Sequence, residues 1–427
     1  MKSRIAFYTF GCRLNQAETA IIQQTFEQQQ YQVVDYRNSA DVVVVNTCTV
    51  TENGDADTRK LVNKINRINP DAKIALIGCQ AQVQREKLFE LPGVQWVVGN
   101  AHKMELEKIF ENGGIDTPQL ITPPISKESF TIPVAGIDKQ HTRANLKIQD
   151  GCDFFCSFCE IPYARGRARS RQFDDLILEA GTLAKAGHHE LVITGINVGT
   201  YRNQDKYVVD ILSALEDING LWRVRISSIE PTTIPVEILS KMQNSKQLCR
   251  YLHIPLQSGS DFILEKMKRN YTVLEFSAFL SEAVRMVKGI CLGTDVIVGF
   301  PGETNDRFME TYQLLLQLPL AYLHVFSYSD RDHARSSKYS GKVSPDMIRE
   351  RSQRLRELSV RKRRFFMESF IGKTEMVLFE QKKNGLWSGL TDNYIRVKVK
   401  SELNLENQLL PVRIEKVEHQ SVAGMLV

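Results

Sequence analysis

The sequence of 427 residues lacks the features of an exported or membrane-spanning protein. It has no uninterrupted apolar run of about 18 residues, the length that a membrane-spanning helix needs. Its longest apolar region, Leu314–Phe326, is broken by Gln317 and Pro319. The apolar run near the start is too short for a secretory signal peptide. With eight cysteines and no export signal, we expect a protein of the reducing cytoplasm whose thiols bind metal instead of forming disulfides.

A strong excess of one charge is also absent. Lys and Arg number 55 against 50 Asp and Glu, which gives a net charge of +5 at pH 7. An excess this small indicates a partner only where the basic residues are clustered. The apolar fraction of 42% is ordinary for a folded protein, and the length corresponds to two or three domains.

A fourth ligand is missing from the most distinctive stretch of the chain. Cys152, Cys156 and Cys159 have C-x-x-x-C-x-x-C spacing, so one short loop can bring three thiols to one metal centre. A structural zinc site needs four ligands, and no further Cys or His lies nearby. Clusters of the 4Fe-4S type use thiolates, and three of them leave one iron open to a small molecule. We therefore favour such a cluster over the alternatives, a zinc site and three unconnected core thiols.

Three more cysteines stand at equivalent places in the N-terminal part. Three short β-rich runs are separated by helix-like segments, as in a parallel α/β sheet, and each run ends at a cysteine. The runs are Ile5–Phe10, Val42–Val45 and Ile74–Ile77, and the cysteines are Cys12, Cys48 and Cys79. Functional groups gather beyond the carboxyl ends of parallel strands, so we expect these thiols to face one another. The pattern favours a second three-cysteine cluster over three small core residues.

These motifs resemble a known family. The stretch from Cys152 to Cys159, including Phe158, resembles the cluster loop of radical S-adenosylmethionine (radical SAM) enzymes. A cysteine-bearing α/β domain ahead of that loop is similar to the methylthiotransferases, which carry two 4Fe-4S clusters. Thr9–Glu18 and Asn46–Thr51 are most similar to the branch that acts on threonylcarbamoyl-adenosine in tRNA.

The resemblance implies an α/β fold in three parts. Residues 1–115 would form a doubly wound parallel α/β domain, and residues 116–135 a proline-containing linker. Residues 136–368 would form the radical SAM core, a partial (β/α)6 barrel, and residues 369–427 a small all-β TRAM barrel. The pattern of apolar runs in the core predicts strands at Leu146–Gln149, Leu191–Thr194, Trp222–Ile226, Tyr251–Ile254, Thr294–Val298 and Tyr322–Phe326, with helices such as Phe173–Ala186 and Val273–Val287.

Polar and glycine residues follow the predicted barrel strands, where parallel barrels carry their chemistry. The resemblance implies that they contact SAM. Glu230 is expected to contact an amino or ribose group of SAM, and Gln257 one of its polar ends. His253 is either a proton carrier or a structural histidine. The expected cofactor-binding residues are Thr194, Gly195, Asn197, Ser228, Glu230, His253, Gln257 and Ser258.

Arginines alternate at Arg165, Arg167, Arg169 and Arg171. In an extended chain they would project to one side as a row that contacts phosphates; the alternative is a solvated surface with structural ion pairs.

Two stretches depart from the family pattern. Glu160 follows the third cysteine where relatives generally have an apolar residue, and Ser329–Lys338 lacks the expected Gly and Thr. We expect these departures to alter a substrate-facing loop without affecting the clusters.

The C-terminal part combines a basic helix with a β-rich tail. Met347–Phe370 has the pattern of a long helix with a clustered excess of Lys and Arg, which is typical of a polyanion surface or of an exposed charged helix. The strands predicted after Gly372 resemble a TRAM domain, which carries RNA. They are Glu375–Phe379, Leu386–Gly389, Ile395–Val399 and Val412–Glu418. The expected RNA-binding residues are Arg361, Lys362, Arg363, Arg364, Trp387, Arg396 and Lys398, although part of the barrel set is equally expected in its core.

The resemblance implies methylthiolation at carbon 2 of the N6-threonylcarbamoyl-adenosine that is 3′ of the anticodon. Cys152, Cys156 and Cys159 would hold the cluster that binds SAM and generates a radical, and Cys12, Cys48 and Cys79 the cluster that donates sulfur. The implied partners are a tRNA anticodon stem-loop and a reducing electron donor. The alternatives are an isopentenyl-adenosine tRNA or a ribosomal protein as substrate, or a non-catalytic iron–sulfur protein that binds RNA or senses redox state.

Overall fold

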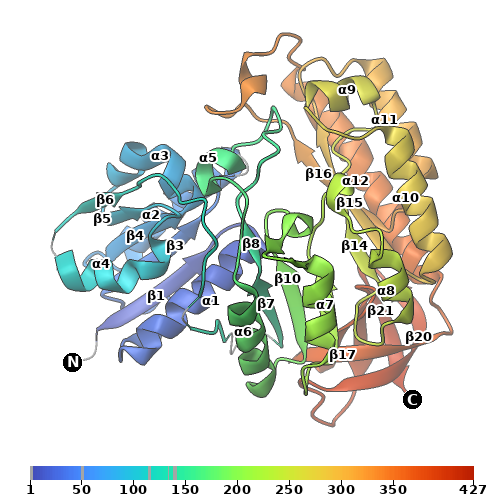
Figure 1. The fold of residues 1–427 in the computed structure, drawn as a ribbon, viewed down its shortest axis with the longest axis horizontal. Coiled ribbons are helices and arrows are strands. Elements are labelled where there is room, and N and C mark those ends of the chain that lie inside the picture. Colours follow the sequence, from blue (N-terminus) through green and yellow to red (C-terminus); the bar gives the residue numbers. More distant parts are fainter. Residues whose placement is uncertain (1–2, 50–51, 114–116, 133, 138–141) are drawn as a thin grey trace.

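The structure is a computed structural model that describes residues 3–49, 52–113, 117–132, 134–137 and 142–427 (Figure 1). A parallel sheet at the N-terminus, an open barrel in the middle and a closed barrel at the C-terminus follow one another along the chain (Figure 1). This confirms the predicted fold class. The expected boundary at residues 115 and 116 lies outside the described residues, as do Val50 and Thr51 of the second cysteine motif.

The N-terminal sheet is parallel throughout, with the strand order β2-β1-β3-β4-β5-β6. Its strands are β1 (Arg4–Thr9), β2 (Gln32–Val34), β3 (Val42–Thr47), β4 (Lys73–Gly78), β5 (Val94–Val98) and β6 (Gln119–Ile121). Its helices are α1 (Arg13–Gln28), α2 (Glu52–Ile68), α3 (Cys79–Phe89) and α4 (Leu106–Gly113), with a 3-10 turn η1 (Lys103–Glu105). Val43 and Val45 enter one apolar core and Val42 and Val44 the other. Both faces of β3 are therefore covered, as in a doubly wound sheet.

The central barrel is built from two parallel three-stranded sheets, β13-β10-β7 and β14-β15-β16. A parallel bridge from Val224 to Leu248 joins them on one side. The strands are β7 (Arg143–Lys147), β10 (Glu190–Thr194), β13 (Arg223–Ile226), β14 (Tyr251–His253), β15 (Cys291–Val298) and β16 (Tyr322–Ser327). The helices are α5 (Ile161–Arg165), α6 (Phe173–Lys185), α7 (Val208–Glu216), α8 (Ile238–Asn244), α9 (Asp261–Lys266), α10 (Val273–Met286), α11 (Asn305–Gln317) and α12 (Pro345–Glu368).

Short elements complete the central part. They are the strand pairs β8 (Gln149–Asp150) with β9 (Arg169–Ser170) and β11 (Arg202–Asn203) with β12 (Lys206–Tyr207), and the 3-10 turns η2 (Val198–Thr200), η3 (Pro231–Thr233) and η4 (Arg335–Lys338). All six predicted barrel strands are present, with ends displaced by up to three residues.

The C-terminal barrel is closed in the order β17-β18-β19-β21-β20. Its strands are β17 (Thr374–Lys383), β18 (Leu386–Thr391), β19 (Arg396–Lys400), β20 (Leu409–Glu418) and β21 (Ser421–Leu426). Met367 at the end of α12 and Phe370 just beyond it pack into the core of this barrel. The long helix therefore fixes the closed barrel to the open one.

The sequence patterns did not predict β2, β5, β6 and β21. β2 and β6 are three-residue edge strands, too short for a periodic signal. β6 lies inside the expected linker and extends the N-terminal sheet by pairing with β5. In the described parts of the chain, none of the helices has both the length and the apolar character needed to cross a lipid bilayer.

Candidate functional site

The three N-terminal cysteines lie where β1, β3 and β4 end. Cys12 precedes α1, Cys48 follows β3 and Cys79 begins α3. Gly11 has a φ of +89°, and a Cβ on it would lie 2.7 Å from the Sγ of Cys48. Glycine is therefore required for this turn to pass the second cysteine. Cys12 is also near enough to Cys79 for their charges to interact. The structure brings the three cysteines together, and their role as ligands remains a prediction.

The other three cysteines lie on the loop that follows β7 and β8. Gly151 opens this loop with a φ of +72°, and a Cβ on it would lie 2.0 Å from the carbonyl oxygen of Arg167. Burial raises the pKa of the Cys152 thiol to about 11. Burial likewise raises the pKa of Cys159, and the charge of nearby Cys156 adds to the rise. The mutual effect shows that these thiols lie close together.

Hydrogen-bond donors point at three of the sulfur atoms. The guanidinium of Arg269 donates from Nη1 to Cys156 Sγ at 3.2 Å, and the amide of Ile161 donates to Cys159 Sγ at 3.4 Å. In the N-terminal set, Asn100 Nδ2 donates to Cys79 Sγ at 3.6 Å. Donors of this kind stabilise negative sulfur and tune iron–sulfur clusters. Both cysteine sets thus have surroundings that fit thiolate ligands of a cluster.

A cluster of buried charges lies beside the N-terminal cysteines. Glu18 of α1 accepts from Lys103 and Lys147 at 2.5 and 2.7 Å and from Arg165 at 3.1 Å. Asp150 accepts from Lys147 and Arg165 and, at 3.1 Å, from Arg169. The side chains of all six residues are at most 12% exposed. These contacts join the N-terminal domain to the barrel.

Positive charge exceeds negative charge in this buried network. Within the described residues just named, four cations face two carboxylates. The pKa of Arg165 lies well above its usual value, because the charges of Cys79, Glu18 and Asp150 outweigh the effect of burial. An unbalanced buried cation is unfavourable, and an anionic group on the N-terminal thiols would compensate it. The network is therefore a second observation that fits thiolate-bound cluster chemistry.

A cavity of about 160 Å3 lies between the two cysteine loops. Thr49, which follows Cys48, lines it from the N-terminal domain, and Cys159 and Glu160 line it from the other loop. The barrel contributes polar Gln257 and Asp295, together with apolar side chains. The apolar lining is formed by Phe158, Ile161, Ile297 and Phe326. This cavity is the candidate reaction site.

The residues expected to contact SAM divide into two groups. Glu230 accepts a hydrogen bond from Arg269, which itself contacts Cys156, so this carboxylate is tied to the cluster loop. Gln257 lines the cavity, with a φ of 67° that few non-glycine residues adopt. Asn197 is 1% exposed and accepts from Thr233 Oγ1 at 2.9 Å.

Other members of the set have hydrogen bonds within the fold. Thr194 donates to the carbonyl of Val192, and Ser258 accepts from the amide of Ser260. Gly195 lies close to Gln149, because a Cβ added to Gly195 would be 3.0 Å from Gln149 Oε1. Ser228 is half-buried beyond the end of β13. Any SAM contact from these positions remains a prediction.

His253 belongs to a polar chain across the barrel. Its Nε2 lies 2.8 Å from Asp295 Oδ1 and its Nδ1 lies 3.0 Å from the hydroxyl of Tyr322. His324 Nδ1 reaches the same Asp295 oxygen at 3.3 Å. Although burial favours the neutral acid, the two histidines hold the pKa of Asp295 well below its usual range. The structural alternative for His253 and a role at the cavity are both compatible with this position.

Some of the basic residues of α12 are held by hydrogen bonds within the fold. Lys362 donates to the carbonyls of Leu316 and Leu318, at the end of α11. Arg363 bonds the carbonyl of Tyr394 in the closed barrel. Arg361 and Arg364 remain exposed, with Arg361 donating to Tyr312 and Arg364 pairing with Glu368.

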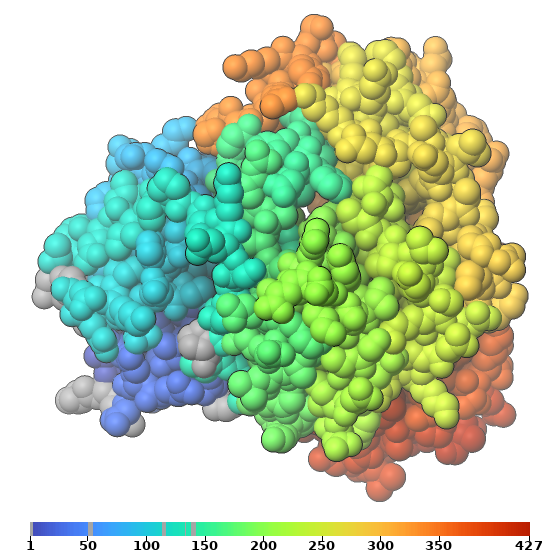
Figure 2. Space-filling model, in the orientation of Figure 1, coloured from blue at the N-terminus to red at the C-terminus, as the bar shows by residue number. Residues whose placement is uncertain are grey.

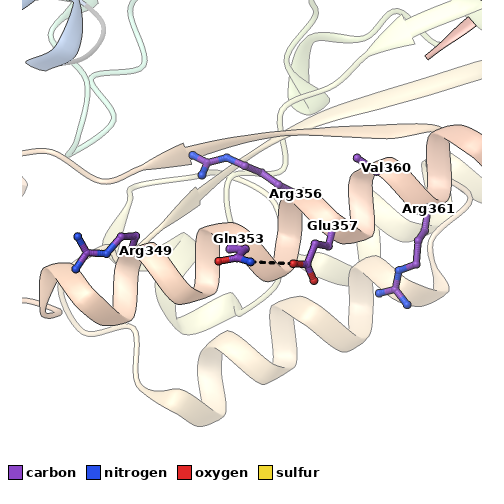
Figure 3. A pocket seen from close by; sticks show the side chains of 6 residues that line it. All are labelled: Arg349, Gln353, Arg356, Glu357, Val360 and Arg361. Atoms are coloured by element: carbon purple, nitrogen blue, oxygen red, sulfur yellow. Dashed lines mark hydrogen bonds between the residues drawn. The ribbon is translucent and has the colours of Figure 1, made fainter. Parts of the chain in front are cut away.

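An open groove runs along this helix. Figure 3 shows Arg349 and Arg361 near its two ends, with Gln353 bonded to Glu357 between them. Mixed charge in the groove weakens the case for a uniform polyanion surface.

Only part of the expected RNA-facing set in the closed barrel lies where RNA could reach it. Trp387 is 6% exposed and packs in the barrel core, so the prediction that it stacks on a base is wrong. Arg396 and Lys398 line a groove of about 610 Å3 together with Arg143 and Lys383. Glu380 also lines this groove and pairs with Arg143 and Arg396. The four basic side chains still exceed this one carboxylate, which favours contact with a phosphate backbone.

The predicted row of alternating arginines is also wrong. Arg165 and Arg171 are fully buried, and Arg171 pairs with Asp175 and Glu179. Arg169 pairs with Asp150, while Arg167 pairs with Asp153 at the surface. The ion-pair alternative applies. Arg165 lies on α5, and β9, which pairs with β8, carries Arg169 and leads into Arg171, so the four arginines do not form one exposed row.

Two site residues, Arg269 and Asp295, had no signal in the sequence patterns, since Arg269 lies in a segment with no motif and Asp295 was hidden within an apolar strand. Arg331 was indicated only as part of the departing run Ser329–Lys338. Only their positions in space relate them to the cysteines.

Comparison with known proteins agrees with the observed fold. Residues 4–99 match the family described as "Uncharacterized protein family UPF0004", and residues 146–315 match the radical SAM superfamily. A solved structure of the radical S-adenosylmethionine methyltransferase TsrM from Kitasatospora setae superimposes with a TM-score of 0.58 at 14% identity, covering 79% of this chain and 77% of that one. This likeness concerns the fold.

Curated relatives match over nearly the whole chain. The threonylcarbamoyladenosine tRNA methylthiotransferase MtaB of Bacillus subtilis is 36% identical, over 99% of this chain and 96% of its own length. The protein of that name from Aquifex aeolicus is 38% identical, over 92% and 96%. The tRNA-2-methylthio-N(6)-dimethylallyladenosine synthase of Protochlamydia amoebophila is 30% identical, over 100% and 97%. The chain therefore belongs to the radical SAM methylthiotransferase family.

Proposed function

We propose that this protein is a cytoplasmic tRNA methylthiotransferase that acts on N6-threonylcarbamoyl-adenosine next to the anticodon. It would replace the hydrogen on carbon 2 of that base with a methylthio group. The observation that carries the proposal is the cavity between the two cysteine loops, because Thr49 and Cys159 line the same space. The relatives from Bacillus subtilis and Aquifex aeolicus, named for this activity, support the choice of substrate.

Two 4Fe-4S clusters and SAM fit the residues present. A 4Fe-4S cluster on Cys152, Cys156 and Cys159 would, with SAM, supply the radical that removes an unreactive hydrogen, and a second cluster on Cys12, Cys48 and Cys79 would supply sulfur.

The protein's own residues would position the reactants. Arg269 holds Glu230 beside Cys156, so that this carboxylate is available for an amino group. Phe158, Ile297 and Phe326 provide apolar walls that exclude water from a reactive intermediate. Gln257 and Asp295 offer the polar contacts from which the base would take its orientation.

The RNA would approach along the basic groove of the closed barrel. Lys383, Arg396 and Lys398 line this groove with Arg143 from the first barrel strand. Arg143 also lines a larger polar cavity that reaches Cys12. The two cavities share Arg143 and Glu380, which makes the surface from the closed barrel toward the N-terminal cysteines continuous.

Nucleoside analysis of tRNA from cells with and without the gene tests the proposal. We expect 2-methylthio-N6-threonylcarbamoyl-adenosine to disappear and its unmethylthiolated precursor to accumulate. Loss of a methylthiolated isopentenyl-adenosine instead would indicate the substrate of the Protochlamydia amoebophila relative. Unchanged tRNA, with a change in a ribosomal protein or in neither, would overturn the proposed substrate.

A further inference from the structure

Two departures from the family pattern, far apart in the sequence, meet in the structure. Glu160 follows Cys159, and Arg331 and His333 belong to the unusual run Ser329–Lys338. Arg331 Nε donates to Glu160 Oε2 at 3.1 Å, and the amide of His333 donates to Glu160 Oε1 at 3.3 Å. The ring of His333 stacks on Tyr163, with centroids 5.3 Å apart. The unusual run therefore docks on the unusual cluster loop.

Arg331 also reaches the N-terminal domain. Its Nη2 donates to the carbonyl oxygen and the hydroxyl of Thr49, at 2.8 and 2.6 Å, and Thr49 directly follows Cys48. Its Nη1 donates to Asp55 of α2 at 2.9 Å. Thr49 and Glu160 are also bonded directly, because the Thr49 hydroxyl donates to Glu160 Oε2 at 3.2 Å. One guanidinium thus bonds the residue after Cys48 and the residue after Cys159.

The bridge is buried and lies at the candidate reaction site. The side chains of Arg331, Glu160 and Asp55 are 7%, 6% and 9% exposed. Thr49, Glu160 and Arg331 all line the cavity between the cysteine loops. Figure 2 shows the orange segment reaching over the junction between the blue-to-cyan N-terminal domain and the barrel. A buried, multiply bonded guanidinium holds its partners more rigidly than a surface ion pair does.

We propose that Arg331, held by Glu160, is a positioning residue that fixes the distance between the two cysteine loops, and so couples radical formation to sulfur transfer. The inference rests on the proposed function. Both residues bond to the protein's own loops, so the proposal assigns neither of them a part in the cleavage of SAM. A displacement of about 1 Å between reacting groups can cost roughly 100-fold in rate, so a looser bridge would uncouple the two halves of the reaction.

The test measures coupling, iron content and the interaction between the clusters. Arg331→Met keeps much of the side-chain volume but removes every hydrogen bond that the guanidinium makes to Glu160, Thr49 and Asp55. We expect it to retain both clusters and still to form deoxyadenosine. The yield of methylthio product per deoxyadenosine should fall about tenfold. With both clusters reduced, the spin–spin broadening of their electron paramagnetic resonance signals should change, because that broadening depends on distance.

Further variants separate positioning from general loosening. The yield of methylthio product per deoxyadenosine should fall as far in Glu160→Ile as in Arg331→Met. It should fall no further in the double variant, because the two residues act as a unit. Glu160→Gln keeps a side-chain oxygen for Arg331 and should recover most of the coupling. Lys342→Met is the matched control, since Lys342 pairs with exposed Asp330 on the same segment and should leave coupling unchanged.

The outcomes are distinct. A wild-type product-to-deoxyadenosine ratio in Arg331→Met overturns the proposal. Loss of iron in both Arg331→Met and Glu160→Gln would assign the bridge to cluster assembly and would also overturn it. If the wild-type protein forms no methylthio nucleoside, the proposed function itself is wrong. The wild-type assay thus tests the proposed function, and the variants test the positioning role.

Discussion

Glu18 and Arg165 form an ion pair between the N-terminal domain and the cluster-bearing loop of the barrel, with 3.1 Å between Oε2 and Nη2 and no exposed surface on either side chain. Lys103 and Lys147 bond the same carboxylate. A buried carboxylate that serves three cations holds the junction of the two domains together, and it limits the cost of burying those cations.

Replacement of Glu18 by Gln should therefore destabilise the protein strongly. Removal of one partner of a buried pair leaves uncompensated charge and typically costs about 3–5 kcal/mol. We expect a lower midpoint of denaturant unfolding for Glu18→Gln in the cluster-free protein. Glu282→Gln is the control, since Glu282 pairs with Arg285 at an exposed site. Equal midpoints for both variants would show that the buried network contributes nothing to stability.

The same network predicts a loss of stability in acid. Burial alone would raise the pKa of Glu18 and Asp150, but Arg165, Lys103 and Lys147 lower the pKa of Glu18, and Lys147, Arg165 and Arg169 lower that of Asp150. A carboxylate with a lowered folded-state pKa stabilises the fold above its unfolded-state value, which is about 4.5 for Glu and 3.8 for Asp. The stabilisation is lost as the pH falls below these values. The melting temperature of the cluster-free protein should thus decline below about pH 5, with a shallower decline in Glu18→Gln.

Iron content tests the two cysteine sets. Anaerobically reconstituted protein should hold about eight irons per chain, because each set would build a four-iron cluster. Replacement of Cys152, Cys156 and Cys159 by Ala should leave about half of the iron. Cys249→Ala is the matched control, since this thiol is buried against Arg225 and belongs to neither set. Full iron in the triple variant, or zinc in place of iron, would contradict the assignment.

Single cysteine variants should separate the two chemistries. Cys48→Ala should still convert SAM to deoxyadenosine under reducing conditions, but without methylthio product. Cys156→Ala should do neither, because it disrupts the set expected to bind SAM. Both products are measured by chromatography and mass spectrometry. Methylthio product from Cys48→Ala would remove the N-terminal set from the reaction.

The basic groove should account for much of the RNA affinity. Replacement of Lys383, Arg396 and Lys398 by Ala should weaken tRNA binding and flatten its salt dependence, by about 0.7–0.9 in the log–log slope for each lost phosphate contact. Arg361 and Arg364, the exposed members of the helix cluster, form a second variant. Lys362 and Arg363 stay unchanged because they hold the fold.

The comparison of the two RNA variants locates the binding face. A larger loss from the groove variant would place the RNA along the closed barrel, and a larger loss from the helix variant would place it on α12. Arg285→Ala, at an exposed position on α10, controls for the loss of one surface positive charge. Unchanged affinity in both variants would exclude both faces.

The sequence was informative where local spacing or a strand end determines the chemistry. The three N-terminal cysteines were placed together because the carboxyl ends of parallel strands share one edge of a sheet. Long-range partners were beyond such reasoning: Arg331 is 171 positions from Glu160, and nothing local to either residue indicates the other. The prediction that Trp387 stacks on a base was wrong for a related reason. Alternation of apolar and polar residues along a strand defines two faces of a closed barrel without showing which face is interior.

The buried network also has a consequence for biosynthesis. Glu18 and Lys103 leave the ribosome well before Lys147, Asp150 and Arg165, so the nascent N-terminal domain has only part of its set of charges. The surplus of positive charge beside Cys79 arises only once the loop after β8 has been made and packed. We therefore expect iron to enter the first cysteine set late, after the loop that carries the second set has been synthesised and packed.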